Sequence, residues 1–181
     1  EMNTYKIGYQ TNFYNRRKGL SVGVGGSWQD ATDLFSLSRT FSMDILFNWS
    51  RFNLDADWHV MNRQSSAEDI DFTYDTGHLR SSYNISVGSK LLEPVFMIMF
   101  LNGGEGEIAE AEAREVGAFS GSETYLNAGL NYYLDQHYLK LVAHYTHQAG
   151  TDGRNIYSVQ GPLGVPVRRG NYFMFGLSAV F

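Results

Sequence analysis

The chain contains no cysteine and only three prolines among its 181 residues. Without cysteine it can form neither disulfides nor thiolate metal sites, although this absence does not by itself assign a compartment. No apolar run approaches the roughly 18–20 residues that a membrane-spanning helix needs. Positive charge is scarce too, with 14 Lys and Arg against 19 Asp and Glu and no basic run. These features argue against a nucleic-acid partner.

The beginning of the chain also lacks two familiar features. No signal peptide is visible, and the first residue is Glu1 rather than methionine. We therefore expect that the sequence is either processed or part of a longer protein.

Glycine and aromatic residues are abundant by contrast. Nineteen glycines and an aromatic content of 15% favour β structure with turns over a helix bundle. The mean hydropathy of −0.29 would ordinarily suggest a soluble protein. A membrane barrel remains compatible with this value, because only alternate residues of its strands face lipid.

The last twelve residues, 170–181, show the alternation that a strand requires. Side chains point to opposite faces of a strand in turn, so one face here is apolar and the other mixed. The segment ends on an aromatic residue with nothing after it, like the closing strand of a bacterial outer-membrane barrel. In that class, such a segment is the signal read by the barrel-assembly machinery. The residues that would carry the signal are Phe173, Phe175, Leu177 and Phe181. The alternative is a strand of a soluble all-β domain.

Similar period-2 patterns recur along the chain and predict about nine strands. We interpret them as one all-β domain over residues 1–181, an antiparallel transmembrane β-barrel. The predicted strands are 5–14, 19–28, 39–50, 54–63, 79–90, 95–102, 122–133, 138–148 and 170–181.

Short and long connections alternate between these strands, which is typical of transmembrane barrels with periplasmic turns and long external loops. The short turns are expected near 15–18, 51–53, 91–94 and 134–137. The long loops are expected at 29–38, 64–78, 103–121 and 149–169. Aromatic residues near both strand ends resemble the two interfacial girdles of such barrels. We therefore expect a Gram-negative outer-membrane location, contact with outer-membrane lipid, and a periplasmic C-terminus.

The direction of the strands then predicts an incomplete barrel. If Phe181 is periplasmic, strict alternation makes the first strand, 5–14, run from the outside inward, whereas a barrel should begin from the periplasm. We expect that these residues are the C-terminal part of a longer barrel, or that other strands complete it. A strand that was split or missed, for example in 149–169, is the alternative.

The stretch Glu123–Thr146 resembles the penultimate hairpin of the phosphate-selective porin O/P family. The resemblance rests on Gly-Leu-Asn-Tyr-Tyr-Leu at 129–134, a polar turn, and a Lys/Leu strand ending in Tyr-Thr; the Phe-rich closing strand is similar as well. It covers mainly 122–181 and implies a sixteen-stranded, usually homotrimeric porin, of which about nine strands would be present. The family's constriction loop, with its anion-binding residues, would lie in the absent half, so no anion selectivity is carried over to this chain.

Polar residues on the other face of the strands are candidates for lining a water-filled lumen, either as a ladder that shapes ion preference or as generic hydrophilic wall. The tight-turn registers place Asp44 opposite His59 and Asn127 opposite His144. The predicted pore-lining residues are Lys6, Asp44, Asp55, Asp57, His59, Arg63, Arg80, Lys90, Glu123, Lys140 and His144.

We expect passive diffusion of small hydrophilic solutes or ions, with phosphate and other anions as candidates, and no enzyme activity, no catalytic residues, no metal and no cofactor. Asp44, Asp57 and His59 would in principle suit a metal or an acid–base pair, but no nucleophile accompanies them. The alternatives are a scaffolding barrel that holds a partner protein in the membrane and, further off, an outer-membrane hydrolase. The acidic loop 103–121 would be a solvated external loop, a short surface helix or a cation-binding rim.

Overall fold

A computed structural model describes residues 18–33, 35–135, 138–150 and 170–179, and this part of the chain is all-β with one short helix. The strands form a nine-stranded antiparallel sheet. The elements are β1 (Gly19–Asp30), β2 (Leu37–Trp49), β3 (Phe52–Gln64), β4 (Asp71–Tyr83), β5 (Ile85–Val87), β6 (Lys90–Asn102), α1 (Glu107–Glu115), β7 (Ser122–Asp135), β8 (Leu139–Gly150) and β9 (Tyr172–Ala179).

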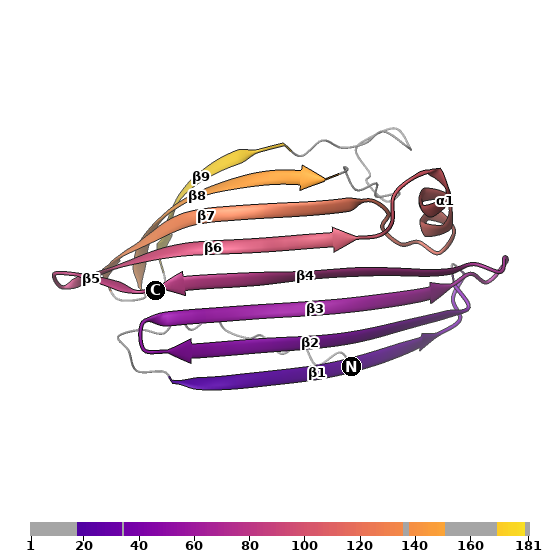
Figure 1. Ribbon diagram of the computed structural model, residues 1–181, viewed down its shortest axis with the longest axis horizontal. Helices are drawn as coiled ribbons and strands as arrows, with labels where there is room; N and C mark the ends of the chain where they lie inside the picture. Colours follow the sequence, from indigo (N-terminus) through magenta and orange to yellow (C-terminus); the bar gives the residue numbers. More distant parts are fainter. Residues whose placement is uncertain (1–17, 34, 136–137, 151–169, 180–181) are drawn as a thin grey trace.

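The sheet is a simple meander in which successive long strands are neighbours, in the order β1-β2-β3-β4-β6-β7-β8-β9, while the short β5 pairs with β6 (Figure 1). The connections at 31–36, 65–70 and 103–121 lie at one end, the long-connection end. The connections at 50–51 and 84–89 lie at the other, the short-turn end, where β7 ends and β8 begins. Among the described residues, β1 pairs with β2 and β9 with β8, and these two edge strands do not pair with each other. The prediction of an antiparallel all-β fold is confirmed, and the described sheet is open.

Strict alternation divides the sheet into two faces of different chemistry. One, which we call the apolar face, carries for example Val22, Ile45 and Leu79, which lie level across β1, β2 and β4 through consecutive register pairs. The other, the polar face, carries the intervening residues, such as Asp44 and Asp57, which are direct partners on β2 and β3. Because the register is continuous, residues of one face lie beside residues of the same face on the next strand.

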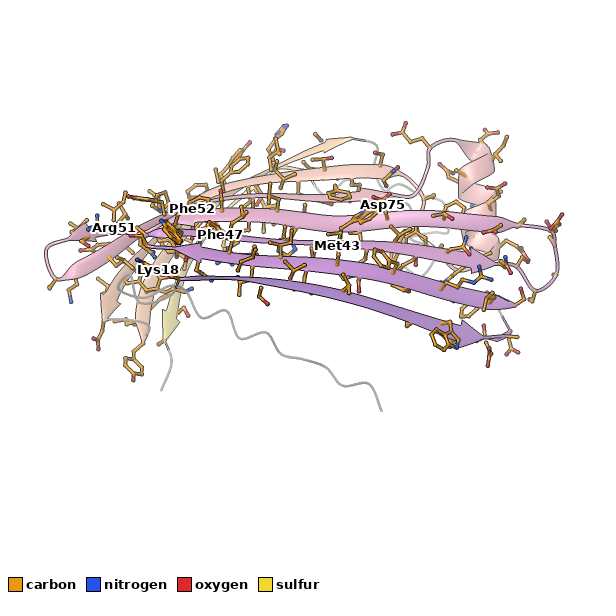
Figure 2. The ribbon with its side chains drawn as sticks, turned by 60° about the horizontal axis from the view of Figure 1, so that its bottom comes forward. Lys18, Met43, Phe47, Arg51, Phe52 and Asp75 are labelled. Carbon is orange, nitrogen blue, oxygen red and sulfur yellow. The ribbon has the colours of Figure 1, made fainter. Side chains whose placement is uncertain are left out.

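The sheet is strongly curved, with the ends of β7 to β9 turned away from the plane of β1 to β4 (Figure 2). Side chains on the inner side of a curved sheet converge. The polar face is the crowded one: Ser82 is 4% exposed and Thr146 1%, whereas Val24 and Phe175 on the apolar face are 75% and 76% exposed. We infer that the polar face is the concave side.

The predicted boundaries of β4 and β6 are wrong. β4 begins at Asp71, inside the predicted loop 64–78, and ends at Tyr83, so the predicted strand 79–90 is not one strand. β6 begins at Lys90 and includes the turn expected at 91–94. In the first half of β4 the buried residues Phe72 and Tyr74 point to the polar face, so the alternation is inverted relative to its second half. The predicted strand 5–14 lies outside the described residues.

The connection 103–121 contains α1 and packs against the sheet. Its residues Ala113, Val116 and Ala118 form a small apolar core with Phe72 and Tyr74 of β4. The described residues include no helix with the length and apolar character to cross a membrane.

Candidate functional site

The apolar face forms an uninterrupted band across the eight long strands. From the limits given below to the opposite ends of the described strands, this face carries no charged side chain before the end residues Lys90 of β6 and Asp135 of β7. Its large side chains are open to the surroundings; Leu20, for example, is 65% exposed. Contiguous apolar surface of this extent on a protein marks contact with a membrane or with another protein.

The band ends at a defined residue on each strand toward the long connections, and this limit shifts steadily across the sheet. Through the register, Trp28 of β1 lies level with Thr73 of β4. Tyr145 of β8 lies level with Ser81 of the same strand. The last apolar residues are Trp28, Phe41, Val60, Gly77, Phe100, Leu126, Tyr145 and Phe173.

The size of this shift gives the angle between the edge of the band and the perpendicular to the strands. From position 73 to position 81 the limit moves eight residues over the six strand-to-strand steps between β1 and β8. The rise is about 3.3 Å per residue and the strand spacing is about 4.8 Å. For the band to lie within one flat layer, the strands must be tilted by about 40° from the normal of that layer. Transmembrane barrels have strand tilts of about 35–45°.

The band has aromatic residues at its borders, and its height is somewhat below the roughly 25 Å of the apolar band of transmembrane barrels. On β2 it runs from Phe41 to Trp49, about 26 Å along the strand and about 20 Å after tilting, and the aromatic side chains at both ends extend it. Just beyond the limit the apolar side becomes polar. There Asp75 accepts hydrogen bonds from Trp58 Nε1 at 3.0 Å and from Asn102 Nδ2 at 3.1 Å.

On the polar face, charged side chains of β3 and β4 form a cluster near the middle of these two strands. His78 lies between two carboxylates, with Nε2 2.9 Å from Asp55 Oδ1 and Nδ1 2.9 Å from Asp57 Oδ1. Arg80 Nε is 3.5 Å from Asp55 Oδ2, and His59 Nε2 is 3.5 Å from Asp57 Oδ2. These side chains are between about a fifth and a third exposed, so this part of the polar face presents both positive and negative charge to solvent.

Toward the short-turn end, a buried carboxylate joins four strands. Glu93 of β6 is fully buried, and it accepts hydrogen bonds from Ser82 Oγ at 2.7 Å, Asn131 Nδ2 at 3.0 Å and the Tyr133 hydroxyl at 2.6 Å. Ser82 in turn accepts from Asn53 Nδ2 at 3.1 Å. A buried carboxylate is tolerated when its oxygens are satisfied by donors in this way.

The same network continues onto β8 through a histidine. His144 Nδ1 lies 2.9 Å from Asn127 Oδ1, and its Nε2 lies 3.1 Å from Asn131 Oδ1. Asn127 Nδ2 also donates to Thr146 Oγ1 at 2.7 Å. The imidazole lies over Gly129, where an added Cβ would come within 2.4 Å of the ring, so this position requires glycine.

The predicted pore-lining residues fall almost entirely on the polar face. Lys90 differs: it is the first residue of β6, shares a side with Leu92, and its Nζ donates to the carbonyl of Leu134. Lys6 and Phe181 lie outside the described residues. Those on the polar face are Asp44, Asp55, Asp57, His59, Arg63, Arg80, Glu123, Lys140 and His144.

The predicted pairings within this set are shifted by two residues. Asp44 lies opposite Asp57 rather than His59, because the β2–β3 turn consists of residues 50 and 51. His144 lies opposite Gly129 rather than Asn127, although the two side chains still meet diagonally. Glu93 was not predicted at all, because it falls in the segment expected to be a turn.

The described residues contain no group of three or more His, Asp or Glu side chains placed to hold a metal ion. Phe173, Phe175 and Leu177 share the apolar face of β9, where each is more than half exposed. Comparison of the chain with protein-family models, curated proteins and solved structures gave no match.

Proposed function

We propose that this chain forms part of the wall of an outer-membrane porin of a Gram-negative bacterium, through which small hydrophilic solutes and ions diffuse passively. The apolar face then contacts lipid and the polar face lines a water-filled lumen. The long connections are extracellular, and the C-terminus is periplasmic.

The observation that carries this proposal is the shift of the apolar band across the strands. A membrane is flat, whereas barrel strands are tilted, so a lipid-facing band must move along successive strands in one direction. The band shifts by eight positions between β1 and β8, which matches a tilt of about 40°. A soluble β-sandwich would instead bury this face against a second sheet.

The proposal also requires further strands at both edges. Backbone groups in a bilayer must be hydrogen-bonded, so open sheet edges do not face lipid. We propose that β1 and β9 are each paired in the complete barrel, in line with the sixteen-stranded, homotrimeric porins that the sequence resembles. The closing strand, with Phe173, Phe175, Leu177 and Phe181, would be the segment read by the barrel-assembly machinery. Phosphate or other anions are possible solutes, with no residue assigned to select them.

A scaffolding barrel is the second candidate, and one observation favours it. Parts of the polar face are already occupied. At one end the Glu93 network joins its side chains by hydrogen bonds. At the other end the 103–121 connection covers it. A barrel whose inner wall is occupied in this way would hold a partner protein rather than pass solutes.

Planar-bilayer recording of the full-length protein separates these two functions. A porin gives stable current steps that are proportional to voltage, and reversal potentials in a salt gradient then report its ion preference. Protein that is correctly folded, as judged by heat-modifiable electrophoretic mobility, but that stays silent in the bilayer would contradict the porin and favour the scaffold.

A further inference from the structure

The β6–β7 connection, residues 103–121, folds over the polar face rather than away from the sheet. Val116 is fully buried, and Ala113 and Ala118 are nearly so. Their neighbours are side chains of the wall itself, since Phe72 and Tyr74 belong to the polar face of β4. Further apolar residues packed against this core are Met61, Ile70, Leu101 and Ala109.

The two ends of the connection are held together at its base. The Gly103 N–H donates to the carbonyl of Gly121 at 2.8 Å, and the Gly121 N–H donates to the carbonyl of Gly104 at 2.6 Å. Gly103 passes so close to the returning chain that an added Cβ would lie 2.1 Å from the Phe119 carbonyl oxygen. The segment is therefore a closed loop with its own packed interior, and it is not an extended excursion into solvent.

A single side chain of β3 binds the backbone just beyond the C-terminal end of α1. Arg63 of β3 donates from Nη1 to the carbonyls of Val116 at 3.2 Å and Gly117 at 2.5 Å. Its guanidinium carbon also lies 4.9 Å from the centre of the Phe35 ring. A cation at a helix C-terminus satisfies carbonyls that lack intrahelical partners and interacts favourably with the helix dipole.

We propose that residues 103–121 form a fixed constriction at the long-connection mouth of the lumen, and that Arg63 is the positioning residue that holds it over the opening. This inference rests on the proposed porin function. The constriction is fixed because lifting it would expose Phe72, Tyr74 and Val116 to water. It would also remove the cationic donor from the carbonyls that follow α1.

Single-channel recording of the full-length protein tests the constriction. Arg63→Ala should raise the conductance at least about 1.5-fold, since current follows the open cross-section of a pore. Replacing residues 105–119 by a short Gly-Ser linker should raise it further, and Arg63→Lys should restore part of the wild-type value. Arg39→Ala is the matched control: Arg39 is exposed on the opposite side of the sheet at the same end, so its loss should leave conductance unchanged.

Thiol accessibility gives a second readout that does not depend on current. Because the chain has no cysteine, Ala113→Cys introduces a single thiol at a position that is 2% exposed. A maleimide reagent should label it slowly, and at least about fivefold faster when Arg63→Ala is added, because labelling of a buried group follows local opening. Ala111→Cys, on the exposed side of α1, should react rapidly in both backgrounds.

The outcomes separate the two proposals. A conducting wild-type protein with unchanged conductance in both Arg63→Ala and the linker variant overturns the constriction and leaves the porin standing. Rapid labelling of Ala113→Cys in the wild-type background overturns the packed position of the loop. Silence of all folded variants, including the linker variant, overturns the porin and the constriction with it.

Discussion

The two faces of this sheet reverse the arrangement of an ordinary soluble protein. On the apolar face, Val24 and Phe175 are three-quarters exposed. On the polar face, Glu93, Ser82 and Thr146 are almost completely buried and are hydrogen-bonded from strand to strand. The apolar face therefore depends on its surroundings for stabilisation, while the polar face is stabilised by partners within the sheet.

This difference indicates where each kind of substitution should act. If the apolar face contacts lipid as proposed, it should tolerate any apolar side chain and be destabilised by a charged one, at a cost that depends on depth in the membrane. The polar face should be sensitive to individual atoms, because each buried donor and acceptor has a specific partner. Three substitutions test this contrast, from the largest expected effect to the smallest.

Leu79→Arg should reduce the free energy of unfolding by about 3 kcal/mol, because it places a cation in the middle of the apolar band. Thr73→Arg on the same strand lies beyond the limit of the band and should cost no more than about 1 kcal/mol. Denaturant unfolding in lipid vesicles measures both. Equal losses at the two positions would show that the band does not follow the membrane.

Glu93→Ala should cost about 2 kcal/mol, because it leaves the donors of Ser82, Asn131 and Tyr133 without their acceptor. Glu93→Gln retains one acceptor oxygen and should cost about half as much. The same unfolding assay applies, with Glu115→Ala on the exposed end of α1 as the control. A loss no greater than that of the control would mean that the network contributes nothing to stability.

Trp58→Phe should have the smallest effect, below about 1 kcal/mol. It removes one hydrogen bond to Asp75 at the border of the band but keeps the edge-to-face packing on Phe41, whose ring centre lies 6.4 Å away. A double-mutant cycle with Asp75→Asn isolates this bond. If the Trp58–Asp75 coupling energy were as large as the loss of unfolding free energy in Leu79→Arg, the border of the band would lie deeper in the membrane than the strand register indicates.

The sequence alone predicts the strands on which the apolar parity stays the same along the whole length. The predictions 122–133 and 138–148 agree with β7 and β8 to within about two residues, because one apolar face and one polar face produce a clean period of two. β4 was missed at its start for the opposite reason. Beyond the band its outer side is polar, while Phe72 and Tyr74 face inward beneath α1, so the apolar parity changes within one strand.

The candidate site was predictable in composition but not in its contacts. Asp55, Asp57 and Arg80 could be assigned to the polar face from parity, since parity survives small errors at turns. Cross-strand partners, in contrast, are changed by such errors. A turn centre displaced by one residue moves every partner by two, so that Asp57 faces Asp44. His78, which contacts Asp57, had no predicted partner. Arg63 binds carbonyls more than fifty residues away in sequence, which no local pattern reports.

The shifted limit of the apolar band has a consequence for how the strands find their pairing. A slip of two residues between neighbours would keep every side chain on its correct face, so alternation alone offers no resistance to it. Such a slip would, however, move one strand by about 7 Å along its axis and by about 5 Å in depth. In the proposed membrane barrel, Trp28, Phe41 or Tyr145 would then leave the headgroup level of its neighbours. On that proposal the bilayer would act as a template for register, because it would penalise pairings that the sheet itself would accept.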